Sequence, residues 1–466
     1  MADIYVRGGW VLTLDPRRRI IRNGAVAISD GVIVDVGKRD ELDARYRYYS
    51  DIVINAEKDI VMPGLINTHV HLVQGLLRHC ADYLPLISWL KNRVWPLQGN
   101  YKPEEALASA KLVLLEMIKT GTTTFLETGL VGRYGPDNII EFVYEAGLRG
   151  VFARHVMDLR GYALEEEAIH KGLIESGDAS FNDTLRLYYK YHGKGNRVWI
   201  WFGPRTPGAV SVELYRRISE KARELNTGIT MHLAEVKEDV EYTVRLFGKK
   251  PVEFANWVGL TGRNVVLVHV VWVDDNEIKL LAETKTNVSH NPSSNMKLGS
   301  GAARVSDMIR SGVNVALGTD GGPSNNTYDL MREMKHAALL QYVTKLNPRA
   351  VRAEEVVEMA TINGARALMI DHLVGSIEVG KRADIIVLDY WVPHLHPLVN
   401  PVSHLVFAAS GSDVKHVIVD GKLIMFNRRV LTLNEEEIIE EAEKRAFELY
   451  SRTGICLEPD TVWPIT

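Results

Sequence analysis

Cysteine is scarce in this chain of 466 residues and occurs only at positions 80 and 456. Two cysteines are too few for a disulfide framework or for a metal site built from thiolates, so a reducing compartment is expected. Glutamine is also rare, which favours a thermophilic source. The N-terminus, Met-Ala-Asp-Ile-Tyr-Val-Arg, lacks the pattern of a secretion signal. We therefore expect a cytoplasmic protein.

Long apolar runs and an excess of positive charge are missing as well. No run approaches the roughly 18 apolar residues that a membrane span needs. The net charge is -4 and the predicted pI is about 6.4, so there is no electrostatic footprint for nucleic acid. Hydrophobic residues make up 46% of the chain and charged residues 24%, as in a soluble globular protein with a large core. Neither a membrane nor a nucleic acid is expected as a partner.

Short strands with alternating apolar and polar residues occur near both ends of the chain. We predict such strands over 4–14, 25–37, 50–56, 383–388 and 414–425, separated by turns such as Asn23-Gly24 and Asp420-Gly421. Because the two groups have the same texture, they predict one small β-sandwich domain assembled from both termini, residues 1–59 plus 371–435. A charged helix from Asn434 to Arg452 follows, and residues 436–466 form a C-terminal helix and tail.

Residues 60–370 alternate apolar strand-like runs with helical stretches, which is typical of repeated βα units and a parallel sheet. The helices include 104–119, 212–225 and 274–283. Eight strands followed by helices are what a closed (β/α)₈ TIM barrel requires, and a span of this length suits a barrel with loop insertions. The predicted strands are 60–71, 122–127, 149–158, 198–205, 228–235, 264–272, 286–291 and 314–320.

Active sites of such barrels lie at the C-terminal ends of the strands. Histidines or carboxylates end at least four of the predicted strands: His69 and His71, His232 and Glu235, His269, His290, and Asp320. A lone histidine after an apolar run is usually a packed core residue. Because several strands of one predicted barrel end in a histidine or a carboxylate, we do not expect all of them to be there by chance.

Four of these residues form a plausible metal site. His69, His71, His232 and Asp320 offer three nitrogens and one carboxylate oxygen, which leaves a position for water as in a catalytic zinc site. A cation there makes hydroxide available at neutral pH. Glu235 could then act as general base and acid, while His269 could orient the hydroxide or stabilise developing charge.

The motifs around these residues closely resemble the amidohydrolase superfamily, in its branch of cytosine, guanine and adenosine-derivative deaminases and chlorotriazine hydrolases. They are Pro63-Gly-Leu-Ile-Asn-Thr-His-Val-His71, His232-Leu-Ala-Glu235, His290-Asn-Pro-Ser-Ser-Asn-Met-Lys-Leu-Gly-Ser-Gly301 and Gly318-Thr-Asp-Gly321. The resemblance covers almost the whole chain. It implies one divalent metal, zinc or iron, and a proton shuttle through Glu235. It also implies that His269 and Asp320 orient the hydroxide and that Asp320 passes a proton to the leaving amine. The absence of a lysine after the fourth barrel strand predicts a mononuclear site.

Within the branch, the segment from Leu84 to Gln98 is similar to the substrate-covering stretch of methylthioadenosine and S-adenosylhomocysteine deaminases. That group typically has an acidic residue where this chain has Gln98 and a histidine near Arg205. A neutral amide holds a ribose diol less strongly than a carboxylate does. A guanidinium only donates hydrogen bonds, so Arg205 would favour a ring acceptor, a carbonyl or an anion.

Other residues have predicted roles in or near the pocket. Trp89 is expected to wall it, because aromatic faces suit planar heterocycles. His290 and Asn291 are candidate substrate contacts, and Ser294 and Asn295 could shape the same region. His79 and His155 could approach the pocket or have a surface or packing role, and Glu127 could contact the substrate or form a salt bridge. A second pair, His394 and His396, lies in a loop between prolines, where a metal role is not expected.

The leading hypothesis is a metal-dependent aminohydrolase that deaminates a nitrogen heteroaromatic ring, such as a purine or an adenosine derivative. A first alternative keeps the site but releases chloride or an alkylamine from a triazine, and guanine or pterin deamination is a related alternative. A remote alternative is a non-catalytic barrel scaffold, although such proteins usually lose ligands. A homodimer or homotetramer is expected.

Overall fold

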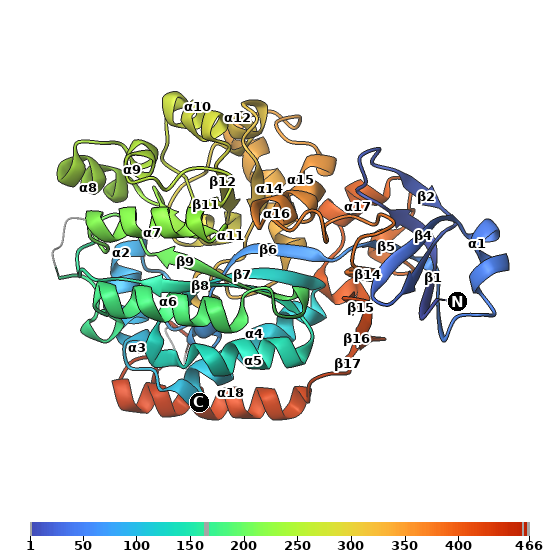
Figure 1. Cartoon of the computed structure of the whole chain (residues 1–466), viewed down its shortest axis with the longest axis horizontal. Coiled ribbons are helices and arrows are strands. Elements are labelled where there is room, and N and C mark those ends of the chain that lie inside the picture. The colour runs from blue at the N-terminus through green and yellow to red at the C-terminus, as the bar shows by residue number, and fades with distance from the viewer. Residues whose placement is uncertain (1, 163–166, 459–460, 464–466) are drawn as a thin grey trace.

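A computed structural model describes residues 2–162, 167–458 and 461–463 and contains two sheets (Figure 1). In the larger body, eight parallel strands pair in chain order, and a bridge between Val70 and Asp320 joins the last strand to the first. The predicted barrel is confirmed. Its strands are β6 (Leu65–Val70), β7 (Thr122–Leu130), β8 (Arg149–Val156), β9 (Val198–Pro204), β10 (Ile229–Leu233), β11 (Val265–His269), β12 (Asn287–His290) and β13 (Val315–Leu317).

The first barrel strand is shorter than the predicted strand 60–71. Residues up to Pro63 belong to β5 (Ile52–Pro63) of the other sheet, and the chain changes sheets at Gly64. The Gly64 N–H donates to Asp384 of the terminal sheet, whereas the next N–H, that of Leu65, donates to Gly121 before β7. A Cβ at Gly64 would lie 2.1 Å from Thr123 Oγ1, so the junction needs glycine.

The second sheet is built from both ends of the chain, as predicted, and lies beside the barrel (Figure 1). Its order is β17-β16-β15-β14-β5-β1-β3-β4, with β2 paired to β1. We expected antiparallel strands, but β1 and β5 run parallel, because helix α1 (Arg39–Tyr46) carries the chain back before β5 begins. The remaining strands are β1 (Ile4–Leu12), β2 (Ile20–Arg22), β3 (Gly24–Ser29), β4 (Val32–Lys38), β14 (Ile385–Asp389), β15 (Val414–Val419), β16 (Lys422–Phe426) and β17 (Arg429–Val430).

A buried ion cluster fastens the two sheets together. The Arg149 guanidinium, at the start of β8, is fully buried and lies 2.6 Å from Asp384 Oδ2 and 2.6 Å from Asp420 Oδ1. Both aspartates belong to the terminal sheet or its turns. Removing one partner of such a cluster would leave a buried charge uncompensated, so the cluster fixes the terminal sheet against the bottom of the barrel.

Helices surround the barrel strands and begin at recognisable caps. Asp274 and Glu277 form a reciprocal capping box at the start of the predicted helix 274–283. The main helices between strands are α4 (Pro103–Lys119), α5 (Pro136–Ala146), α6 (Gly177–Tyr191), α7 (Val212–Glu224), α8 (Lys237–Phe247), α9 (Pro251–Trp257), α10 (Asp275–Thr284), α12 (Val305–Arg310), α14 (Leu330–Lys345), α15 (Ala353–Met359), α16 (Ile362–Ala367) and α17 (Pro401–Phe407). Shorter helices near the mouth are α2 (Leu86–Trp89), a π-helix (Leu90–Val94), α3 (Trp95–Gln98), α11 (Pro292–Lys297) and α13 (Gly322–Asn325).

The predicted C-terminal helix is α18 (Glu435–Thr453), which lies along α4 on the side of the barrel, at the lower edge of Figure 1. Lys111 and Glu441 form an ion pair of 2.7 Å between the two helices, and Arg452 lies 2.6 Å from Glu105. The predicted tail runs to 466, but 459–460 and 464–466 lie outside the described residues. No helix in the described ranges is long and apolar enough to cross a membrane.

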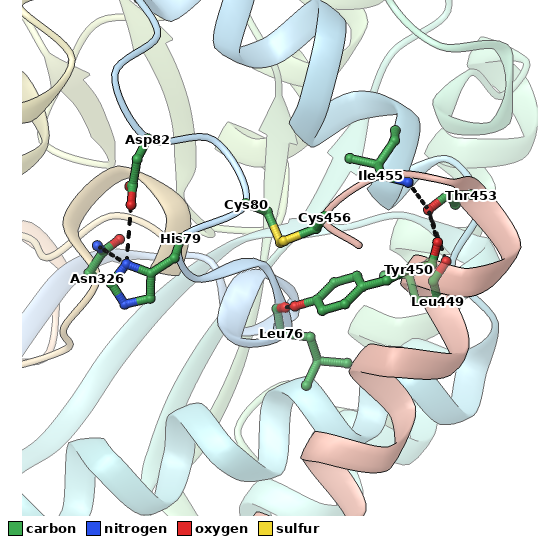
Figure 2. The surroundings of a disulfide bond; sticks show 10 residues. All are labelled: Leu76, His79, Cys80, Asp82, Asn326, Leu449, Tyr450, Thr453, Ile455 and Cys456. Atoms are coloured by element: carbon green, nitrogen blue, oxygen red, sulfur yellow. Dashed lines mark hydrogen bonds and ion pairs between the residues drawn. A yellow bond between two sulfur atoms is a disulfide. The ribbon is translucent and has the colours of Figure 1, made fainter. Parts of the chain in front are cut away.

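The two cysteines, from which we inferred a reducing compartment, form a disulfide bond (Figure 2). Cys80 follows the 3₁₀ turn at Leu72–Leu77 after the first barrel strand, and Cys456 follows α18. Beside the bond, the Tyr450 hydroxyl donates to the Leu76 carbonyl. A separation of 376 residues hides such a pairing from the sequence, and the scarcity of cysteine is no longer an argument for a reducing compartment.

Candidate metal centre and active site

Four residues predicted as metal ligands converge at the mouth of the barrel. Asp320 Oδ1 lies 3.2 Å from His69 Nε2 and 3.4 Å from His71 Nε2, and His232 Nε2 lies 3.3 Å from His71 Nε2. All four side chains are buried. The ligand atoms of His69, His71 and His232 lie within 4.8 Å of one another, and Asp320 Oδ1 contacts both rings of the first pair, which lie on one side as the alternation along the strand predicted.

Local backbone geometry brings these side chains together. His71 follows β6 with an extended backbone, so its ring stays on the same face as that of His69. Asp320 adopts a left-handed conformation with φ of 61°, and its N–H donates to the His69 carbonyl at 2.9 Å. A left-handed conformation is uncommon for a residue with a side chain and concentrates at functional sites. A Cβ on Gly318 would lie 2.7 Å from the His69 Cβ, so this approach of β13 to β6 requires glycine.

The donor set fits a divalent cation. Burial lowers the pKa of His71 and of His232 well below the ordinary value, and the positive charges around them add to this effect. Both rings are therefore neutral, the form in which imidazole binds metals. Thr128 Oγ1 lies 3.0 Å from His69 Nδ1 and so turns Nε2 of that ring towards Asp320. Within the described part of the chain, His69 Nε2 has no hydrogen-bond partner.

Arg205 lies at the edge of this set. Its Nη1 is 2.9 Å from His232 Nε2, and its side chain is buried. Among the described residues it has no carboxylate partner, and its Nε has no hydrogen-bond partner. A metal ion and Nη1 cannot both occupy the lone pair of His232 Nε2. Arg205 Nη1 would therefore have to leave His232 Nε2 before that nitrogen could bind a cation.

Glu235 is placed to carry a proton. It follows β10 after Ala234, whose φ of 52° turns the chain, and its Oε2 lies 3.5 Å from His269 Nε2. Burial raises the pKa of Glu235 well above the ordinary value, and the charges of Asp320 and Asp239 raise it further. Asp239 Oδ2 accepts the N–H of Glu235 at 3.0 Å and fixes the turn. A buried carboxyl with a raised pKa suits proton transfer near neutral pH.

His269 ends β11 with φ of 70°, and burial lowers its pKa to about 3. Its Nδ1 lies 3.3 Å from Asn291 Nδ2 and 3.0 Å from Asn295 Nδ2. Asn291, a predicted substrate contact, therefore contacts a predicted catalytic residue. In helix α11, which Asn291 precedes, the Ser294 hydroxyl donates to Asp320 Oδ2 at 2.6 Å.

The other predicted substrate contacts are buried but are not hydrogen-bonded to the converging residues. Gln98 ends α3, and its Oε1 lies 3.5 Å from Gln74 Nε2. The Trp89 indole N–H donates to the Pro323 carbonyl at 3.3 Å, which ties the segment after the first strand to the loop after Asp320. His290 is fully buried, with no partner for either ring nitrogen in the described residues.

Three residues with open roles differ in their surroundings. Glu127 accepts hydrogen bonds from the backbone N–H groups of Leu72 and Gly129. Burial raises its pKa to about 8, although these hydrogen bonds act to lower it. It therefore holds the turn after β6 in place. His155, at the mouth, is buried, and burial lowers its pKa well below the ordinary value. His79 is exposed and lies 3.2 Å from Asp82 (Figure 2).

The second histidine pair lies away from the barrel mouth. His394 Nε2 is 3.0 Å from Asp413 Oδ2, and the His396 ring packs edge-on against Trp391 at 4.7 Å between centroids. The two rings of this pair therefore have separate partners.

Sequence reasoning missed the supporting contacts of Thr128 and Asp239 and left those of Ser294 and Asn295 unassigned. Thr128 was missed because β7 runs to Leu130, beyond the predicted strand end at 127. Their position in the sequence could have identified them, because each lies at the end of a barrel strand or within a few residues after it, where active-site residues of such barrels gather.

The protein is thus a (β/α)₈ barrel with a buried centre of histidines and an aspartate at its mouth. The model of the Amidohydrolase family matches residues 60–424, and the chain belongs to that family, whose enzymes are metal-dependent. A model described as an imidazolonepropionase-like composite domain of bacteria matches residues 24–47. The match over residues 60–424 covers all the quoted motifs and confirms the resemblance to the family.

Individual relatives give a finer comparison. A 5'-deoxyadenosine deaminase of Methanosarcina acetivorans is 40% identical over 455 residues, covering 97% of this chain and 100% of the relative. A 5-methylthioadenosine/S-adenosylhomocysteine deaminase of Thermoanaerobacter pseudethanolicus is 37% identical, covering 97% and 100%. The crystal structure of an adenosine deaminase from Xanthomonas campestris with bound zinc has a TM-score of 0.90 at 28% identity, covering 97% and 99%.

Proposed function

We propose that this protein is a zinc-dependent aminohydrolase that removes the ring amino group of an adenosine derivative, with a 5'-substituted adenosine as the favoured class. The observation that carries the proposal is the convergence of His69, His71, His232 and Asp320 beside the buried carboxyl of Glu235. The full-length similarity to enzymes named for 5'-deoxyadenosine and methylthioadenosine supports the substrate class.

In this proposal His69, His71, His232 and Asp320 hold one divalent cation. Zinc suits three imidazoles and one carboxylate, and it is named in the related adenosine deaminase structure, whereas iron would accept the same ligands. The chemistry that the cation supplies is the activation of a water molecule at neutral pH.

Proton movement falls to the residues of the chain. Glu235 takes a proton from the attacking water and delivers it to a ring nitrogen, and its raised pKa suits both halves of that transfer. His269, kept neutral by burial, orients the attacking oxygen. Asp320 takes the remaining proton from the hydroxyl added to the ring and passes it to the departing amine, so that ammonia leaves and a ring carbonyl remains.

Substrate recognition is assigned to Arg205, Gln98, Trp89, His290 and Asn291. Arg205 offers donors to a ring nitrogen, because its Nε lacks a partner and a guanidinium accepts nothing. Gln98 would contact the ribose, where its neutral amide favours tolerance of different sugars over tight binding of a diol. Asn291 would reach the substrate only through a change in its contact with His269.

A cytoplasmic location and assembly as a homodimer or homotetramer belong to the same proposal. The location is carried over from the expectation drawn from the sequence. The disulfide does not exclude it, since intracellular proteins of hyperthermophiles carry disulfides.

The test is ammonia release by the zinc-loaded protein across a panel of compounds. The panel contains 5'-deoxyadenosine, methylthioadenosine, S-adenosylhomocysteine, adenosine, guanine, a pterin, cytosine and a chlorotriazine. We expect the highest kcat/KM with a 5'-substituted adenosine. Chloride release from the triazine without ammonia from any adenosine would replace the proposal with its triazine alternative, and no turnover of any compound would refute it.

A further inference from the structure

The disulfide joins the chain end to the loop that leads into the covering segment, Leu84–Gln98, which resembles a substrate-covering stretch. Cys80 lies between the 3₁₀ turn at Leu72–Leu77 and α2, the first helix of the covering segment. Cys456 follows the last residue of α18 by three positions. Figure 2 shows the bond between this loop and the end of α18. The bond therefore acts on the stretch of chain between the proposed metal centre and the covering segment.

The covering segment reaches the candidate active site through two buried tryptophans. The Trp89 indole N–H donates to the Pro323 carbonyl of α13. The Trp95 ring packs edge-on against Tyr162, with 5.5 Å between ring centroids. Burial raises the pKa of Tyr162 well above the ordinary value, and nearby carboxylates, Glu235 among them, raise it further. The covering segment thus extends from α13 to the surroundings of Glu235, and a change in its position would alter the site.

The loop that contains Cys80 is held from two sides. On one side, an ion pair of 2.6 Å between Lys297 and Asp82 ties it to the end of α11. On the other side, the disulfide ties it to the chain end, and the Tyr450 hydroxyl of α18 donates to the Leu76 carbonyl just before the loop (Figure 2). Breaking the disulfide would leave the ion pair in place and weaken the hold of α18 on the loop.

Three residues at or beside the bond have a left-handed backbone. The φ angle is 62° at His79, 61° at Tyr83 and 66° at Cys456. This conformation is unfavourable for residues with a side chain and persists where the surrounding structure imposes it. The Tyr83 side chain is 87% exposed, so its own packing does not impose the conformation. We therefore expect the loop to relax when its covalent link to α18 is broken.

The chain end after α18 has few other attachments. The Ile455 N–H donates to Thr453 Oγ1 at 3.4 Å (Figure 2). Residues 456–458 make no hydrogen bond with any other residue that the structure describes. Leu457 is 54% exposed. Apart from the packing of Ile455 and Cys456 on the core, the disulfide is therefore what keeps the chain end against the loop.

A cavity of about 360 Å³ opens beside the bond. Both cysteines line it, together with Asp82, Arg93 and Leu457. Cys456 is half-buried, whereas Cys80 is only 6% exposed. Thiol–disulfide exchange begins when a thiolate attacks one sulfur of a disulfide, so it requires access to that sulfur. The cavity provides this access for a small thiol, and Cys456 is the more accessible of the two cysteines.

We propose that the Cys80–Cys456 bond is a thiol-sensitive clamp on the covering segment, and that the cavity beside it admits the small thiol that opens the clamp. The thiolate attacks the Cys456 sulfur, the bond between the two cysteines breaks, and Cys80 leaves as a thiolate. A second thiol then attacks the mixed disulfide on Cys456. The products are two cysteine thiols in the protein and one disulfide formed from the two small thiols.

Opening the clamp loosens the covering segment and so weakens substrate binding. A protein that holds its binding-competent conformation for only part of the time has a correspondingly lower apparent affinity. The proposed effect on the substrate rests on the proposed deaminase function, whereas the exchange reaction and the loosening do not.

The first measurement counts free thiols in the folded protein. Alkylation followed by mass spectrometry should find none in the untreated wild type and two after incubation with 2-mercaptoethanol without denaturant. Two free thiols in the untreated protein, or a bond that resists 2-mercaptoethanol until the protein unfolds, would overturn the proposal.

Hydrogen exchange then measures the clamp without a substrate. On reduction, the amides of residues 78–98 should exchange faster by about tenfold or more, because a lost constraint favours local opening. The amides of β1 in the terminal sheet should not change, which separates local release from a loss of overall stability. Cys456→Ser should show the faster exchange without any thiol and no further change when 2-mercaptoethanol is added. Equal exchange of residues 78–98 in the oxidised and reduced proteins would refute the clamp.

Steady-state kinetics measure the consequence for the substrate. Reduction, or Cys456→Ser, should raise KM for the favoured adenosine derivative by about 5-fold or more, with kcat and zinc content nearly unchanged. Leu457→Ser is the matched control, because this exposed neighbour of Cys456 forms no covalent link. It should match the oxidised wild type in thiol count, exchange and KM. An unchanged KM despite faster exchange would contradict the proposed effect on substrate binding.

Failure of the clamp and failure of the proposed function are distinguishable. If the wild-type protein deaminates nothing, the proposed function fails, but thiol counts and hydrogen exchange still decide whether the clamp exists. If Cys456→Ser does not fold, Cys456→Ala and the reduced wild-type protein provide the same comparison.

Discussion

The chain contains two His-x-His pairs with identical spacing and different surroundings. His69 and His71 lie in or just after an extended strand at the barrel mouth, buried and turned to one side. His394 and His396 lie in and after a 3₁₀ turn, exposed, with separate partners. A strand places positions i and i+2 on one face, whereas a 3₁₀ turn with three residues per turn does not. The same spacing therefore brings two imidazoles together only when the backbone between them is extended.

The largest expected effect comes from removing a nitrogen of the first pair. His71→Asn should lose stoichiometric zinc and reduce kcat/KM by more than about 100-fold, because losing a ligand exceeds the loss of a supporting contact. His396→Asn, the same change at the same spacing, should alter neither quantity. Elemental analysis and steady-state kinetics on both variants check this. Zinc retained by His71→Asn, or lost by His396→Asn, would erase the distinction between the pairs.

The next effect concerns Glu235, the proposed proton-transfer group beside the centre that the first pair helps to form. Glu235→Gln preserves size but cannot transfer a proton, so kcat should fall by about 10²–10⁴-fold. Zinc content should remain at wild-type level. Glu238→Gln, exposed on the following helix, is the matched control and should keep full activity. An active Glu235→Gln enzyme would show that another group moves the proton.

The smallest effect is expected at the second pair itself. His394→Ala removes the contact with Asp413, but the His394 side chain is 47% exposed, and exposed ion pairs contribute about 1 kcal/mol or less. We expect a loss of that size in the free energy of unfolding, with zinc content and kcat unchanged. Denaturant titration measures it. A loss of several kcal/mol would mean that the loop supports the terminal sheet far more than its exposure indicates.

The sequence predicted the parts of the molecule that depend on periodic patterns. The eight barrel strands and the four converging residues follow from apolar runs that end in polar residues, because parallel strands bring their C-terminal ends to one mouth. The parallel pairing of β1 with β5 and the change of sheet at Gly64 depend instead on which distant strand accepts each N–H. No local pattern encodes that choice.

The supporting contacts could not be predicted for a different reason. That Thr128 faces His69 and that Asn295 faces His269 are matters of side-chain direction within the folded barrel. Ser293 and Ser294 are chemically identical neighbours, yet one contacts Asp320 and the other contacts His336. Only the direction of α11 distinguishes them.

The bond between Cys80 and Cys456 closes most of the main chain into a covalent ring. Strands β7 to β17 lie on this ring, while β1 to β6 form a linear arm that leads into it. His69 and His71 belong to the arm, and His232 and Asp320 belong to the ring. A single proteolytic cut within the ring would open it without releasing a fragment until the bond is reduced. In the proposed metal centre, a cation would therefore link His69 and His71 of the arm to His232 and Asp320 of the ring.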